Sequence, residues 1–156
     1  MGCHPLAREE GPTVRRILVA VEDSPAGLAA GRTAIEIASD WSGEVRAVHV
    51  LVDGIVDETL GGHGDAADVR ARRDAGAWAV LRHVAALAAS AGVPAETLVL
   101  HGRPAPSILE QAAAWPADCV VIGRVGSARL GRPYVGSVVH HVLEFSEVPV
   151  LVVPPP

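Results

Sequence analysis

The sequence predicts an α/β fold: a five-stranded parallel sheet with helices on both faces. Short apolar segments rich in β-branched residues alternate along the chain with longer segments of helical periodicity. Regular alternation of this kind is typical of parallel sheets, whose strands are joined by crossover helices. The chain has 156 residues, of which 49% are hydrophobic, so its size and composition are those of one globular domain.

Continuous apolar runs mark the expected strands. Each run is rich in valine, isoleucine or leucine and is bounded by charged residues, glycine or proline, as strands buried on both faces are. The runs occupy residues 16–21, 45–52, 97–100, 119–122 and 148–153.

The first two helices have clear end signals. Ser24 and Pro25 supply an N-cap and a first-turn proline for the helix after the first strand, and Gly43 closes that region. A long alanine-rich helix is expected over about residues 66–91, where Gly92 is a natural C′ residue.

Prolines and glycines also delimit the last two helices. One helix begins at Pro104 or Pro106 and is closed by Pro116, and the other follows Gly136. The three tryptophans fall on helical segments, and we expect them to pack against the protein interior. They are Trp41, Trp78 and Trp115.

Two segments lack such periodicity. Residues 1–14 are expected to form a disordered tail, and the glycine-rich residues 53–65 a flexible loop, so that the domain spans residues 15–156. The two cysteines, Cys3 and Cys119, do not form a disulfide framework, and an inert thiol in the cytoplasm is the expected state of each.

Charge and composition exclude several classes of function. The chain carries 13 basic and 18 acidic residues, so a nucleic-acid partner is not expected. Every basic residue is arginine, which excludes a Schiff-base or P-loop lysine. The apolar runs are too short to span a bilayer, and no secretory leader opens the chain, so we expect a cytoplasmic protein without a membrane partner.

A glycine-rich connection follows the fourth expected strand. Gly123 and Gly126 come directly after that strand, and Gly136 and Ser137 open the last helix. Glycines let a backbone approach an anion closely, and a helix N-terminus adds unpaired N–H donors and a favourable dipole. Three arginines lie in or beside the same loop, namely Arg124, Arg129 and Arg132. The segment therefore predicts a phosphate-binding loop, with a tight connection that binds nothing as the alternative.

These residues resemble the G-x2-G-x9-G-[S/T] motif of single-domain, ATP-binding universal stress proteins. The likeness extends over about residues 15–153. It includes the first strand, His49-Val50 at the end of the second, the stretch from His101 to Pro104, and the terminal strand. The resemblance implies a Rossmann-like sheet of the adenine nucleotide alpha hydrolase type.

The resemblance also implies a set of nucleotide-binding residues. The glycines and Ser137 would hold the triphosphate, Ala20 and Val50 would border the adenine, and Ile122 would pack near the nucleoside. Glu22 and Asp23 depart from the family's usual Asp-Gly, and either carboxylate could contact the nucleoside. The full set is Ala20, Glu22, Asp23, Val50, Ile122, Gly123, Gly126, Arg129, Gly136, Ser137 and Val138.

The expected function is that of an ATP-binding stress-response sensor or regulator, with Mg²⁺ arriving on the nucleotide and an unidentified downstream protein. No catalytic constellation and no protein metal site stand out, so weak ATP hydrolysis is the most that is expected of it. The alternatives are a slow ATPase and an interaction module that binds no nucleotide. The apolar run 148–153 would lie at a sheet edge, and the resemblance implies a homodimer paired through Val148–Val153.

Overall fold

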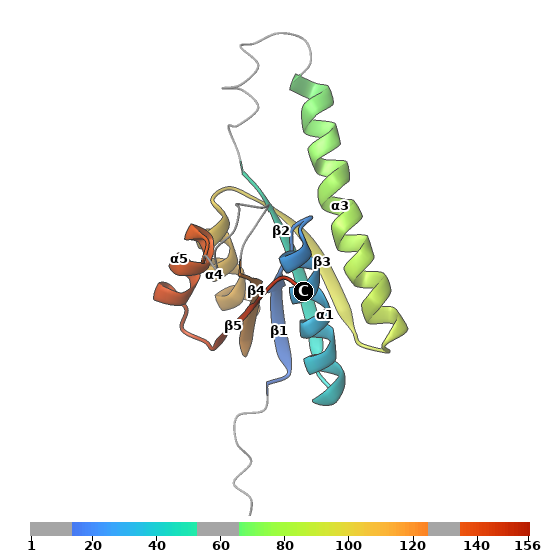
Figure 1. Cartoon of the computed structure of the whole chain (residues 1–156), viewed down its shortest axis with the longest axis vertical. Helices are drawn as coiled ribbons and strands as arrows, with labels where there is room; N and C mark the ends of the chain where they lie inside the picture. The colour runs from blue at the N-terminus through green and yellow to red at the C-terminus, as the bar shows by residue number, and fades with distance from the viewer. Residues whose placement is uncertain (1–13, 53–65, 125–134) are drawn as a thin grey trace, which may run out of the picture.

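The structure, a computed structural model, describes residues 14–52, 66–124 and 135–156. Its sheet has five strands in the order β3-β2-β1-β4-β5, and every neighbouring pair is parallel (Figure 1). The strands are β1 (Arg16–Ala20), β2 (Glu44–Leu51), β3 (Ala95–His101), β4 (Cys119–Gly123) and β5 (Val150–Val153). The α/β fold class predicted from the sequence is therefore confirmed.

Helices cover both faces of this sheet (Figure 1). On one face, helices α1 (Pro25–Asp40) and α3 (Ala66–Ser90) pack their small and branched side chains onto Ile17, Val19 and Val121. On the other, α4 (Pro104–Ala114) and α5 (Ser137–Phe145) pack onto Leu18, Val120 and Ile122. Neighbouring residues of β1 and β4 thus enter opposite cores, which explains why these strands read as unbroken apolar runs.

The chain reverses its direction of travel across the sheet at β1. From β1 it moves outward through β2 to β3, then returns to the other side of β1 to form β4 and β5. Ala20, at the end of β1, lies between Val48 of β2 and Ile122 of β4. In open α/β sheets, ligands bind beyond the carboxyl ends of the strands at such a reversal.

The helix ends agree with their sequence signals. Ser24 is the N-cap of α1, and its side chain accepts a hydrogen bond of 3.0 Å from the Gly27 N–H. Gly92 follows α3 with φ +68°, a conformation that glycine adopts without strain. Pro104 is the first residue of α4, which resolves the choice between the two prolines in its favour.

Asp118 links the N-terminal ends of β1 and β4. Its Oδ2 accepts hydrogen bonds from the backbone N–H groups of Arg15 and Arg16, at 2.9 and 2.8 Å. The peptide of Asp118 donates in turn to the Arg16 carbonyl at 2.8 Å. Val14, assigned to the tail by the sequence, packs against the core next to this junction. The rest of the expected tail, residues 1–13, and all of the expected loop, residues 53–65, lie outside the described residues.

Several packing expectations are wrong. Trp41 and Trp78 are 49% and 42% exposed, because Trp41 follows the end of α1 and Trp78 falls beside the buried face of α3. Of the three tryptophans only Trp115 packs against a core, and Arg46 lies over its ring.

The last strand begins at Val150 rather than Val148. No helix in the described part of the chain is long and apolar enough to cross a membrane.

Candidate functional site

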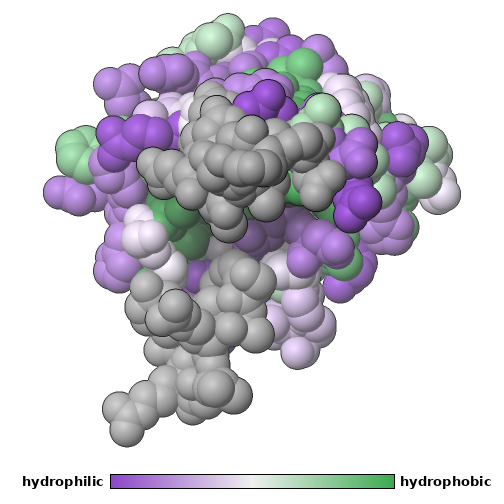
Figure 2. All heavy atoms as spheres, turned by 90° about the horizontal axis from the view of Figure 1, so that it is seen from above, coloured by the Kyte–Doolittle hydropathy of each residue, from purple (hydrophilic) through white to green (hydrophobic). Residues whose placement is uncertain are grey.

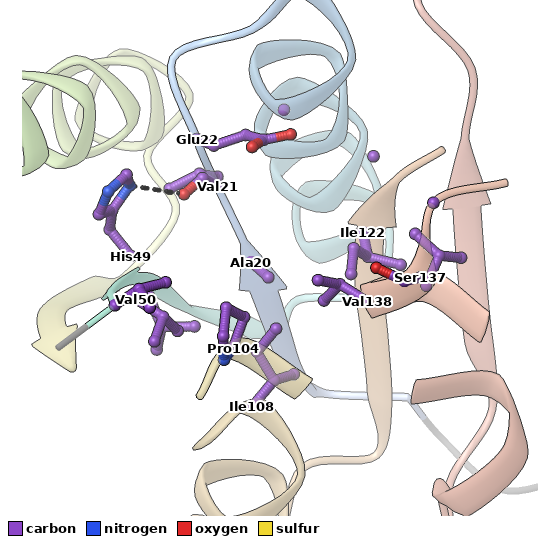
Figure 3. A pocket seen from close by; sticks show the side chains of 16 residues that line it. Ala20, Val21, Glu22, His49, Val50, Pro104, Ile108, Ile122, Ser137 and Val138 are labelled. Atoms are coloured by element: carbon purple, nitrogen blue, oxygen red, sulfur yellow. Dashed lines mark hydrogen bonds between the residues drawn. The ribbon is translucent and has the colours of Figure 1, made fainter. Parts of the chain in front are cut away.

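A cavity of about 500 Å³ opens where β1 and β4 part, at the carboxyl end of the sheet (Figure 3). Its walls come from the ends of β1, β2 and β4, from the first turn of α1, and from the N-terminal turns of α4 and α5. Figure 2 shows this end of the molecule from above, where hydrophobic residues appear between hydrophilic ones. The cavity is in the range of volumes that small-molecule sites occupy.

Most of the predicted site residues line this cavity. They are Ala20, Glu22, Val50, Ile122, Gly123, Gly136, Ser137 and Val138. Asp23 is not among the lining residues, because it lies at the exposed tip of the turn between β1 and α1. Gly126 and Arg129, together with Arg132, lie outside the described residues.

Other lining residues were not predicted. They are Val21, Gly27, Val48, His49, Val52, Pro104, Ile108 and Val139. Two of them could have been predicted from the sequence pattern, because Val48 shares a strand face with Val50 and Ile108 lies one helical turn after Pro104. His49 belongs to the His49-Val50 stretch that resembles the family, but nothing in the sequence shows which group its imidazole contacts.

The N-terminus of α5 forms one end of the cavity. Gly136 is its N-cap, a residue that has no side chain with which to cap the first turn. The Gly136 N–H donates to the Arg124 carbonyl at 3.2 Å, which brings the two ends of the glycine-rich connection together. The next three N–H groups have no acceptor within the helix, and the side chain of Ser137 lines the cavity beside them. Backbone donors in this arrangement bind anions.

The two described glycines of the motif have different surroundings. A Cβ on Gly123 would lie 2.7 Å from the Ala26 carbonyl carbon, so this glycine lets α1 approach β4. A Cβ on Gly136 would meet its nearest atom, the Arg124 carbonyl oxygen, at 3.9 Å, and the Gly136 backbone has an ordinary φ of −65°. Among the described residues, none therefore fills the space in front of Gly136.

The opposite end of the cavity lies between the ends of β1 and β2. Ala20 and Val50 give it apolar walls, and the Nδ1–H of His49 donates to the Val21 carbonyl at 2.9 Å (Figure 3). Nδ1 carries the proton here because a carbonyl oxygen only accepts. From α3, the Arg73 guanidinium donates to the Val52 carbonyl at 2.9 Å, which ties that helix to the wall formed by β2.

Glu22 is the only carboxylate among the described lining residues. The Ser24 hydroxyl donates to its Oε1 at 3.2 Å, and the Ser24 N–H donates to its carbonyl at 2.8 Å. Gly27 packs so closely against this turn that a Cβ would lie 2.5 Å from the Glu22 carbonyl oxygen. These contacts hold the carboxylate between the apolar end of the cavity and the N-terminus of α5 (Figure 3).

The site offers donors for an anion, apolar walls for a flat ring and a carboxylate between them. Such a carboxylate accepts hydrogen bonds from hydroxyl groups. Among the described residues, no three side chains of histidine, cysteine, aspartate or glutamate are grouped so that they could hold a metal ion. The arrangement suits the binding of a molecule with a ring at one end and a phosphate at the other.

A family model and two curated proteins that match this chain all point to the same family. The model of the universal stress protein family matches residues 13–154. The chain is 32% identical over 154 residues to universal stress protein MJ0531 of Methanocaldococcus jannaschii, covering 91% of this chain and 83% of that protein. It is 29% identical over 144 residues to YxiE of Bacillus subtilis, with 88% and 97% covered.

Solved structures of low sequence identity share the fold. The hypothetical protein MJ0577 superposes with a TM-score of 0.78 at 20% identity, covering 91% of this chain and 96% of that one. A universal stress protein in complex with cAMP gives 0.67 at 22% identity, with 92% and 99% covered. The universal stress protein from Archaeoglobus fulgidus in complex with dAMP gives 0.63 at 24%, with 90% and 98% covered.

Proposed function

The chain belongs to the universal stress protein family, and we propose that it is a member that binds ATP, with Mg²⁺ carried by the phosphates. Occupancy of the site would then regulate a downstream protein during the stress response, in the cytoplasm. Hydrolysis of the bound ATP is expected to be slow at most.

The cavity at the carboxyl end of the sheet carries this proposal. Its apolar end between Ala20 and Val50 suits an adenine ring, and the N-terminus of α5 with Ser137 suits the phosphates. Glu22 lies between them, where the hydroxyl groups of a ribose would be. Two solved universal stress proteins that share this fold hold the adenine nucleotides cAMP and dAMP, which supports the same class of ligand here.

One observation favours the alternative of an interaction module that binds no nucleotide. The carboxylate of Glu22 adds negative charge to the cavity, and that of Asp23 follows in the next residue. Both act against the approach of a triphosphate. ATP binds only if the donors of the glycine-rich connection and the charge on Mg²⁺ outweigh this repulsion.

Calorimetric titration with ATP and Mg²⁺ tests the proposal on the wild type and on Gly136→Val. The wild type is expected to bind, and the variant to lose at least about tenfold in affinity, because its side chain occupies the space left for the phosphates. The contacts that the described residues make around Gly136 predict that the variant folds, which its circular dichroism and melting temperature check.

The possible results separate the candidate functions. No heat with the wild type would leave the interaction module as the function, and equal binding by both proteins would move the phosphates away from α5. Release of inorganic phosphate in the same samples, at a rate that depends on Glu22, would favour the slow ATPase.

A further inference from the structure

His49 takes part in an unusual contact at the point where the sheet divides. Strands β1 and β2 pair in register up to Ala20 and Val48, and the Val21 N–H then donates to the Val48 carbonyl at 2.9 Å. If the parallel ladder continued, the Val21 carbonyl would accept from the N–H of Val50. Among the described residues it accepts instead from the Nδ1–H of His49, at 2.9 Å.

This side-chain bond replaces a backbone bond and lets the two strands separate. Val48 directs its carbonyl toward β1, and Val50, two residues further along the strand, directs its N–H and C=O to the same side. Because the Val21 carbonyl is bonded to the imidazole, the backbone of Val50 is left facing the crevice. Val21, His49 and Val50 all line the cavity there (Figure 3).

We propose that His49 is a positioning residue for the base of the nucleotide. Its Nδ1–H holds the end of β1 at a fixed distance from β2, so that the crevice stays wide enough for a purine and the Val50 backbone stays free to pair with it. The inference rests on the proposed function, because it assigns the base to this crevice. His49 would thereby affect the affinity for the nucleotide without contacting its phosphates.

Two substitutions separate the hydrogen bond from the bulk of the side chain. His49→Leu has similar size and no donor, whereas His49→Asn keeps a donor nitrogen attached to Cγ, as Nδ1 is. Affinities are measured by calorimetry for ATP and for tripolyphosphate, which has the phosphates without the base. His49→Leu is expected to lose about fivefold to tenfold for ATP, the equivalent of one net hydrogen bond, and nothing for tripolyphosphate. His49→Asn is expected to recover most of that loss.

Three results would overturn the inference. Unchanged ATP affinity in His49→Leu would show that the bond does not position the base. An equal loss for ATP and tripolyphosphate would indicate general damage to the fold. Equal behaviour of the Leu and Asn variants would show that the donor is irrelevant.

A ligand-free measurement distinguishes this inference from the proposed function. Long-range ¹H–¹⁵N spectra of the imidazole at about pH 8 are expected to show His49 protonated on Nδ1. The amide signals of Val21, Glu22 and Val50 should shift in His49→Leu and stay near the wild-type positions in His49→Asn. If the wild type binds neither ligand, the proposed function fails, and with it the role of His49 in positioning a base. These spectra would then still test whether His49 positions the Val21 carbonyl.

Discussion

Replacing Gly123 by alanine is expected to destabilise the protein at a defined contact. The new Cβ would lie 2.7 Å from the carbonyl carbon of Ala26, 2.8 Å from its oxygen and 2.9 Å from the Gly27 nitrogen. These are backbone atoms of the first turn of α1, and they yield less easily than the end of a flexible side chain. Overpacking of this kind costs roughly 1–3 kcal/mol.

A smaller effect on the unfolded chain opposes this strain. Alanine restricts the unfolded chain more than glycine does, which stabilises the folded state by about 0.4–1 kcal/mol. The net loss is therefore about 1.3 kcal/mol, which corresponds to a fall in melting temperature of about 3–5 °C for a domain of this size. Urea titration and thermal melting followed by circular dichroism, at one protein concentration, measure both quantities.

Gly76→Ala provides the matched control. Gly76 lies within α3, and a Cβ there would meet nothing within 4 Å. Alanine is the better helix former, so this variant is expected to gain about 0.5–1 kcal/mol. If Gly123→Ala were as stable as the wild type while Gly76→Ala behaved as expected, the close approach of α1 to β4 would not be what requires glycine at position 123.

Two further predictions concern the surface around β5. Burial raises the pKa of the Cys119 thiol, although a backbone hydrogen bond at Leu151 lowers it in part, so less thiolate is present at a given pH. In a Cys3→Ser background, alkylation by iodoacetamide at about pH 8 is expected to be slower in the folded protein than in urea; equal rates would contradict the protection. Leu151 is 38% exposed on the edge strand, and we propose that β5 pairs with its copy in a homodimer. Leu151→Asp should then sediment as a folded monomer, and a wild type that sediments as a monomer would refute the pairing.

The strands and helices could be predicted because their signals are local. Apolar runs bounded by charged residues, glycine or proline predicted all five strands, and Ser24, Gly92 and Pro104 marked ends of α1, α3 and α4. The limits of β3 were less clear because Ala95 and Glu96 do not read as a buried strand. In the sheet, Glu96 pairs with Arg46 of β2, whose Nε donates to Glu96 Oε2 at 3.0 Å. An ion pair between strands is a property of the pairing, which the sequence of one segment does not contain.

The exposed tryptophans show a second limit of local reasoning. Large apolar side chains are usually buried, which is why all three tryptophans were expected to pack inside. Position on the helix decides burial here, however. The buried face of α3 carries Ala77, Val80, Leu81, Val84 and Ala88, and Trp78 falls beside that face, where it is 42% exposed.

One part of the candidate site could likewise be predicted from a local motif, and the other part could not. A motif read from the sequence includes the residues around α5, since Gly136 and Ser137 follow each other on one short segment. The end of the cavity near β1 depends on where the sheet ladder stops, and the bond from His49 to the Val21 carbonyl joins positions 28 residues apart. Strand periodicity places His49 on a face of the sheet but does not say which carbonyl its imidazole meets.

The turn after β1 shows how the departure from the family's usual Asp-Gly is accommodated. The sequence left open which of the two carboxylates could contact a nucleoside. The bond from the Ser24 N–H to the Glu22 carbonyl closes the turn tightly, which places Asp23 at its exposed tip and Glu22 in the cavity. The Ser24 hydroxyl accepts from Gly27 and donates to Glu22, so the N-cap of α1 also orients the longer carboxylate. Glu22 can therefore be held in place although it has one methylene more than aspartate, because the helix cap restrains the flexibility that the methylene adds.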